Sequence, residues 1–261
     1  MSVALEDIRL AGTNPDAKGP LFDGLSLRIG DQGRVGILGG SKSGKSTLLR
    51  LICGTKPPDD GRIKRNGRVS WPIPLSSFLV GGHTLARNIR FIARVYGIDD
   101  ETFPRRIVEM VELTDFLNTP FVKCPKLTRQ RLGFALGVGL EFDLYLFDGS
   151  FTPVDKPFKE KAAAVSAART AGRAVVVATS VPAEVEQNCE SVYVLENGRA
   201  TFFAEASQGV EHFKQLLGLE EKKKKGKGDA ARRGDDEDED QDETGLGDMD
   251  ILAAAVADAV D

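Results

Sequence analysis

The sequence is poor in the residues that build metal centres and disulfide frameworks. Its 261 residues include three cysteines and two histidines. Cys53, Cys124 and Cys189 lie far apart without a CxxC pair, and no zinc-ligand spacing of cysteine and histidine occurs. We therefore expect three reduced structural thiols, and we assign no catalytic role to His83 or His212.

Long apolar runs are also lacking. The two longest candidates, residues 174–178 and 251–257, fall far short of the roughly 20 residues that cross a bilayer. The first residues, MSVALEDIRLAG, lack the basic and apolar stretches of a secretory signal. We expect a chain that does not itself span a membrane and that stays in the cytosol.

Charge is distributed unevenly along the chain. The net charge is −4, but residues 219–261 alone hold 7 Lys and Arg against 15 Asp and Glu, which leaves the remainder mildly basic. Residues 220–247 offer almost nothing to bury, a composition typical of disorder. Because lysines and acidic residues are mixed in this segment, nucleic acid is a poor partner for it.

The composition predicts three segments, which are a compact domain over 1–218, a disordered charged linker over 219–247 and a short helical tail over 248–261. Apolar residues stand at helical spacing in the tail, at Met249, Leu252, Val256 and Val260. This spacing fits either a transient helix or a docking helix.

Residues 1–218 alternate apolar strands with helical patterns. Strands are expected at 3–11, 25–30, 34–40, 144–148 and 174–180, and a hairpin at 192–203 turns at Asn197 and Gly198. Helices are expected at 43–54, 88–96, 101–116, 129–140, 157–171 and from about 183. The order predicts an α/β domain with an antiparallel start, a mainly parallel core sheet and a mostly helical insert at about 84–140.

The strongest motif lies between an expected strand and an expected helix. GGSKSGKS at 39–46 fits the phosphate-loop pattern G-x-x-x-x-G-K-[ST] at every fixed position. In such a loop backbone N–H groups surround phosphate oxygens, the lysine reaches the terminal phosphates and the last hydroxyl can ligate magnesium. The predicted nucleotide-binding residues are Gly39, Gly40, Ser41, Lys42, Ser43, Gly44, Lys45, Ser46 and Thr47.

A phosphate loop also requires a carboxylate that positions the metal ion, at the end of a neighbouring strand. The run LYLFD ends at Asp148 and supplies one. We therefore predict that Ser46 and Asp148 bind Mg²⁺. An Asp that only caps a turn after the strand is the other interpretation of Asp148.

Beyond the phosphate loop, five stretches carry a family resemblance: LLRLICGTKPPDDGRI, GRVSWPIP, TLARNIRFIARVYGI, RLGFALGVGLEFDLYLFD and VYVLENGRA. With them, nearly all of residues 1–217 resembles the nucleotide-binding domain of an ABC transporter. At Trp71, Pro72 and residues 88–97, the sequence resembles the branch of this family that exports capsular and other cell-surface polysaccharides.

The resemblance implies a P-loop NTPase fold of the ABC type with a small helical subdomain, which binds ATP and Mg²⁺. It also implies two partners, a membrane permease and a second nucleotide-binding domain, in a homodimer or a heterodimer. The implied location is the cytoplasmic face of the bacterial inner membrane.

The sequence departs from the family pattern in the segment with which one nucleotide-binding domain contacts the ATP held by the phosphate loop of the other. The LSGGQ-type signature is expected directly before Arg129, but the residues there are CPKLT at 124–128, without serine or glycine. Loss of its hydroxyl and backbone donors weakens contact with the γ-phosphate. Lys126 or Thr128, at the start of the following helix, could replace those donors.

Other catalytic positions of the family differ as well. The expected glutamate after Asp148 is Gly149, the expected switch histidine is Ser180, and the expected glutamine falls on Val80. Gly12 stands where the family carries an aromatic residue against adenine. We therefore assign no catalytic base, and we expect weak ATP binding and little turnover.

Two functions remain open, both with ATP as the family ligand. The first is an ATP-binding subunit of a polysaccharide exporter, weak or inactive in hydrolysis on its own. The second is a pseudo-ATPase that holds or regulates a transporter or a polysaccharide-assembly complex.

Asp155 is either a dimer contact or a helix cap. A phosphate-loop kinase leaves Trp71 and the C-terminal hairpin unexplained.

Overall fold

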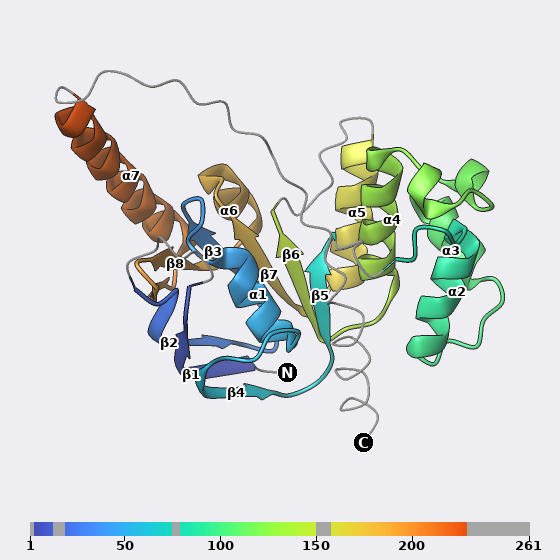
Figure 1. Ribbon diagram of the computed structural model, residues 1–261, viewed down its shortest axis with the longest axis horizontal. Helices are drawn as coiled ribbons and strands as arrows, with labels where there is room; N and C mark the ends of the chain where they lie inside the picture. Colours follow the sequence, from blue (N-terminus) through green and yellow to red (C-terminus); the bar gives the residue numbers. More distant parts are fainter. Residues whose placement is uncertain (1–2, 13–18, 75–78, 150–157, 229–261) are drawn as a thin grey trace.

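The computed structural model describes residues 3–12, 19–74, 79–149 and 158–228, and Figure 1 shows their arrangement. Two sheets form the body of the described structure. One has three strands in the order β2-β1-β4, and the other has six in the order β5-β6-β7-β3-β8-β9. The predictions for Asp155 and for residues 248–261 lie outside the described residues.

The smaller sheet is antiparallel and contains β1 (Val3–Leu10), β2 (Phe22–Ile29) and β4 (Asp60–Arg65). Val3 pairs with Ile29 on one side and with Arg65 on the other. The antiparallel start is therefore confirmed. The sequence reasoning did not identify β4, because its residues DGRIKR are almost entirely exposed and show no alternation of apolar and polar side chains.

The larger sheet is parallel except for its last strand. It contains β5 (Val69–Ile73), β6 (Leu144–Asp148), β7 (Ala174–Thr179), β3 (Gly33–Gly39), β8 (Ser191–Glu196) and the antiparallel β9 (Arg199–Phe203). The hairpin of β8 and β9 turns at Asn197 and Gly198 as predicted. Since β3 lies between β7 and β8, the phosphate loop leaves the sheet near its middle.

The two faces of the larger sheet bury different partners. Ile37, Leu146 and Val176 pack with helix α1 (Lys45–Cys53) and the antiparallel sheet. The neighbouring residues in each strand point to the other face, because side chains alternate along a strand. There, Phe147 and Val177 pack against the helical insert.

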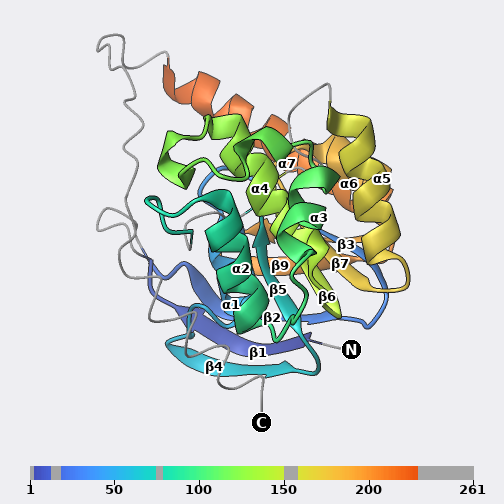
Figure 2. The ribbon, with the colours of Figure 1, turned by 90° about the vertical axis from the view of Figure 1, so that its right-hand side faces the viewer.

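The insert contains α2 (Leu85–Val95), α3 (Phe103–Met110) and α4 (Lys126–Gly139), with short 3₁₀ turns η1 (Thr114–Phe116) and η2 (Phe121–Lys123). Figure 2 shows the three helices side by side over the sheet. The helix expected at 101–116 ends early, since Glu112 has φ +59, which no helix accommodates. The ring of Trp71 in β5 meets Tyr96 at 5.8 Å and Phe142 at 5.7 Å, which fixes the insert to the sheet.

Three more helices complete the described structure, α5 (Lys159–Thr170), α6 (Pro182–Asn188) and α7 (Ala206–Gly228). Helix α7 continues past residue 219, where the sequence predicts the charged linker to begin, and that boundary stays a prediction. None of the described helices is long and apolar enough to cross a membrane.

Candidate functional site

The phosphate loop connects β3 to α1, as the motif predicts. Gly44 precedes α1 with φ +94, a conformation that glycine adopts easily. A Cβ atom on Gly39 would lie 2.5 Å from Ser43 Oγ and 2.9 Å from the carbonyl oxygen of Leu195. A Cβ atom on Gly44 would lie 2.9 Å from the ring of Phe22. Glycine is therefore required at both positions by close packing.

Lys45 is folded back onto the loop. Its Nζ donates to the carbonyl oxygens of Gly39 at 3.0 Å and Gly40 at 2.7 Å, and it lies 3.4 Å from Ser43 Oγ. Burial lowers the pKa of Lys45, and the charge of Asp148 acts in the opposite direction. The ammonium group is thus held at the mouth of the loop, where it can exchange carbonyl oxygens for phosphate oxygens.

Asp148 ends β6, and its position in the sheet brings it towards the phosphate loop. It pairs with Ala178 of β7, which in turn pairs with Ile37 of β3. The carboxyl ends of these three parallel strands therefore lie side by side. Its charge acts on Lys45. The structure therefore brings Lys45 and Asp148 within electrostatic reach of each other, and the role of Asp148 at the metal ion stays a prediction.

The residues present fit a magnesium ion bound through a nucleotide. Among the described residues, no three His, Cys, Asp or Glu side chains gather as a preformed metal site. The hydroxyl of Ser46 and the carboxylate of Asp148 are oxygen ligands that Mg²⁺ accepts, and phosphate oxygens and water would complete its coordination. No contact between these two side chains is seen, so their role as ligands stays a prediction.

Gly149 and Ser180, the positions expected to carry a catalytic base and a histidine, lie at this same end of the parallel strands. Gly149 follows β6 with φ +98, and its N–H donates to the carbonyl oxygen of Ala178 at 2.7 Å. Ser180 follows β7 and is exposed. Neither residue carries a group that could accept a proton from water near neutral pH.

Val80 lies in a turn, and the sequence alone did not identify the residue that stabilises this turn. The side chain of Asn88, only 1% exposed, accepts from the N–H of Val80 at 2.8 Å and donates to its carbonyl oxygen at 3.1 Å. Asn88 also donates to the carbonyl oxygens of His83 and Thr84. The sequence reasoning missed Asn88, although a polar residue within the apolar pattern of α2 was a usable signal.

The helix that follows the altered signature begins earlier than predicted. It starts at Lys126, not Arg129, so the residues after Pro125 form its first turn. Thr128 is only 6% exposed, which keeps its hydroxyl from solvent, whereas Leu127 is 42% exposed. Of the two residues suggested as replacement donors, Lys126 is therefore the accessible one.

A cavity of about 1190 Å³ surrounds the phosphate loop. Its lining includes residues 40–47, and therefore Ser41, Lys42 and Thr47. Gly12, the tip of the β8–β9 hairpin and three residues of α7 also line it. The contribution of α7 was not predicted, because it depends on how the end of the described chain packs back against the sheet.

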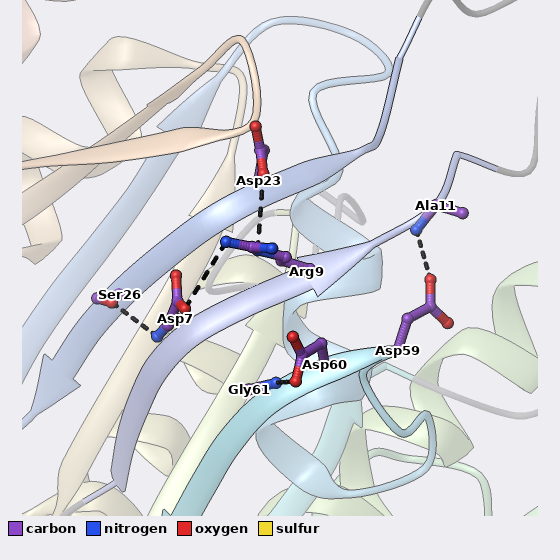
Figure 3. A network of polar contacts seen from close by, with 8 residues as sticks. All are labelled: Asp7, Arg9, Ala11, Asp23, Ser26, Asp59, Asp60 and Gly61. Atoms are coloured by element: carbon purple, nitrogen blue, oxygen red, sulfur yellow. Dashed lines mark hydrogen bonds and ion pairs between the residues drawn. The ribbon is translucent and has the colours of Figure 1, made fainter.

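Asp23 links the cavity wall to a charged group on the antiparallel sheet (Figure 3). It lies 3.8 Å from Arg9, which also lies 4.0 Å from Asp7. Asp7 has φ +51 and its N–H donates to Ser26 Oγ, where the register of β1 shifts. All three charged side chains are more than half exposed, so these ion pairs contribute little stability.

Comparison with known proteins agrees with this geometry. Residues 22–149 match the family described as ABC transporter. The "ATP-binding protein BexA" of Haemophilus influenzae is 34% identical over 182 residues, which cover 70% of this chain and 84% of that protein. The "Capsule polysaccharide export ATP-binding protein CtrD" of Neisseria meningitidis serogroup B is 32% identical and covers 74% and 89%.

Solved structures support the fold. A structure described as the ATP binding subunit of an ABC transporter has a TM-score of 0.66 at 22% identity and covers 77% of this chain and 88% of that one. The ATP-binding cassette MJ0796, described as a dimeric post-hydrolysis state with ADP and Pi, has a TM-score of 0.63 at 18% identity and covers 76% and 96%. From the identity and coverage of the two sequence relatives, this chain belongs to the ABC transporter family.

Proposed function

We propose that this chain is the ATP-binding subunit of a transporter that exports capsular or other cell-surface polysaccharide. The observation that carries the proposal is the phosphate loop, which is complete in sequence and lies in an open cavity with Lys45 at its mouth. The polysaccharide assignment is supported by CtrD and by the "Polysialic acid transport ATP-binding protein KpsT" of Escherichia coli, 27% identical over 84% of this chain. These relatives favour a transporter subunit over a separate regulatory protein.

The bound species in this proposal is ATP with Mg²⁺. Backbone N–H groups of the phosphate loop and the positive end of α1 would bind the phosphates, and Lys45 would contact the terminal ones. Ser46 and Asp148 would hold the ion, which would neutralise charge on the phosphate oxygens.

The proposal includes two partners and a location. A membrane permease would provide the route for the polymer, the arrangement that membership of the ABC transporter family implies. A second nucleotide-binding domain, from the same or another chain, would face the phosphate loop. The location is then the cytoplasmic face of the bacterial inner membrane, where closure of the two domains would be transmitted to the permease.

We further propose that hydrolysis at this chain's own loop is weak. A positioned general base contributes roughly 10² to 10⁴ in rate, and Gly149 provides none. Loss of donors to the γ-phosphate costs roughly 10² to 10³ more where CPKLT at 124–128 faces a partner's loop. A partner with a complete signature would supply donors to this chain's loop but not the missing base.

Single-turnover measurement tests the proposal. Purified protein in excess over [γ-³²P]ATP is assayed for bound and for hydrolysed label, with Lys45→Ala as the loop variant. Lys64→Ala, an exposed lysine paired with Glu6 on the antiparallel sheet, is the matched control. We expect bound label without hydrolysis, lost in Lys45→Ala and kept in the control.

Other outcomes would change the proposal in different ways. Hydrolysis that Lys45→Ala abolishes would show that another residue replaces the missing base. No binding by the unaltered protein would overturn ATP binding as the function. In cells that export polysaccharide with this chain, export that survives Lys45→Ala would instead favour a role that does not need nucleotide.

A further inference from the structure

Helix α7 has an apolar stripe that continues beyond its contact with the sheet. Ala206, Val210 and Phe213 are buried and pack with Val192 and Val194 of β8. Spacings of four and three residues place all three on one face of the helix. The next position of this stripe, four residues after Phe213, is Leu217.

Leu217 is not covered by the sheet. Its exposed fraction is 37%, which marks it as one of the exposed large apolar side chains of the described structure. Leu216 beside it is half-buried against the same cluster as Phe213. An apolar surface therefore remains on the helix after the sheet contact ends.

This surface forms part of the wall of the nucleotide cavity. Phe213, Leu216 and Leu217 line the same cavity of about 1190 Å³ as the phosphate loop. Gly12 lines it too but offers no side chain. The cavity thus combines a loop suited to phosphate with an apolar wall, the combination typical of small-molecule sites.

A nucleoside triphosphate has the matching chemistry. Its phosphates carry the charge that the loop and Lys45 bind, and its base has two flat faces of low polarity that pack on apolar side chains. We propose that Leu216 and Leu217 of α7 form the surface on which the base of the bound nucleotide packs. The inference rests on the proposed binding of ATP by the phosphate loop and adds the residues that contact the base.

Calorimetric titration of the full chain with two ligands tests the inference. ATP carries the base and the ribose, whereas tripolyphosphate presents a chain of three phosphates without either. The variant is Leu217→Gln, which removes apolar surface at an exposed helix position where folding is not at risk. The matched control is Phe202→Gln, since Phe202 is 53% exposed and does not line the cavity.

The expected result is selective. Leu217→Gln should weaken ATP binding about tenfold, the scale of small changes in an apolar contact, and leave tripolyphosphate binding unchanged. The heat-capacity change of ATP binding should become less negative, because less apolar surface is buried. Phe202→Gln should bind both ligands like the unaltered protein.

Several outcomes would overturn the inference. Equal affinity of the unaltered protein for ATP and tripolyphosphate would mean that the base contributes nothing. Unchanged ATP affinity in Leu217→Gln, or equal weakening of both ligands, would exclude a contact with the base. A change of oligomeric state in Leu217→Gln with unchanged ATP affinity would assign this surface to a protein partner. Failure of the unaltered protein to bind either ligand would instead refute the proposed function itself.

Discussion

Gly149 donates its backbone N–H to the carbonyl oxygen of Ala178 at 2.7 Å, which ties the residue after β6 to the adjacent strand β7. Its φ is +98, and, its chain neighbours aside, a Cβ atom there would meet no atom of the described residues within 4 Å. The position therefore has room for a side chain, but its backbone conformation is one that residues other than glycine rarely adopt.

The backbone at Gly149 predicts that restoring the family's glutamate is costly. We expect Gly149→Glu and Gly149→Ala each to lower the free energy of unfolding by about 1 to 2 kcal/mol, because both place a Cβ atom at positive φ. Urea denaturation provides the measurement. Gly82→Ala is the matched control, since Gly82 also has open space but no positive φ, and it should change stability by less than about 0.5 kcal/mol. If Gly149→Ala were as stable as the unaltered protein, the hydrogen bond from Gly149 to Ala178 would not hold this backbone at positive φ.

The half-buried Lys45 of the phosphate loop predicts a conflict between stability and nucleotide binding. Because burial lowers the pKa of Lys45 in the folded protein, its charge destabilises the fold at neutral pH. Lys45→Met should therefore unfold at a higher temperature than the unaltered protein while losing nucleotide binding.

The same pKa shift sets the pH dependence of that difference. The unfolded state binds more protons than the folded one between the lowered pKa and the ordinary value of 10.5, so stability of the unaltered protein rises with pH there. The advantage of Lys45→Met should be fully present at pH 7 and shrink as the pH approaches 10.5. Melting temperatures across this range test the prediction, and a constant gap would contradict it.

Asn88 predicts a stability effect that no functional motif would suggest. Asn88→Ala removes the hydrogen bonds to Val80, His83 and Thr84 and leaves the half-buried N–H of Val80 without its acceptor, so we expect a loss of about 2 to 3 kcal/mol in the free energy of unfolding. Asn188→Ala, which removes bonds to the carbonyl oxygen and the carboxylate of Glu184 at a half-buried site, should cost about 1 kcal/mol or less. Equal losses in the two variants would show that the turn at Val80 does not depend on Asn88.

The cysteines are predicted to be unreactive in the folded protein. Burial raises the pKa of Cys189 to about 12 and also raises the pKa of Cys53 and Cys124 above its ordinary value. At pH 8 the thiolate of Cys189 is then present at about 10⁻⁴ of the total. Reaction with a thiol reagent at pH 8 should be slow for all three residues until denaturant is added. Rapid labelling of one cysteine in the native state would contradict this expectation.

Residues with a strict local requirement were the ones that the sequence predicted. The phosphate loop follows from glycines that a Cβ atom would exclude, and the buried strands follow from continuous apolar runs such as residues 174–178. β5 was missed since it contains Pro72, which the sheet tolerates because β5 is an edge strand. The role of α7 in the cavity could not be predicted, because it arises from packing between segments far apart in the chain.

The first turn of α4 carries the last prediction, on the altered signature. α4 begins at Lys126, and because Thr128 is buried, Lys126 is the accessible residue of the pair that could contact a partner's γ-phosphate. If it replaces the missing donors, Lys126→Ala should lower ATP turnover of this chain assembled with its permease and second nucleotide-binding domain. The expected loss is about tenfold or more, the scale of a lost charge-assisted hydrogen bond.

The control for this effect is Lys123→Ala, which removes an equal charge from the turn η2 just before the helix. A general effect of positive charge near the interface would lower turnover in both variants, whereas a specific contact would affect Lys126→Ala alone. Turnover that is unchanged in Lys126→Ala would mean that α4 offers no substitute for the lost signature. The site facing it would then be inactive whatever loop the partner supplies, because neither the hydroxyl nor the close backbone approach of the family signature is available there.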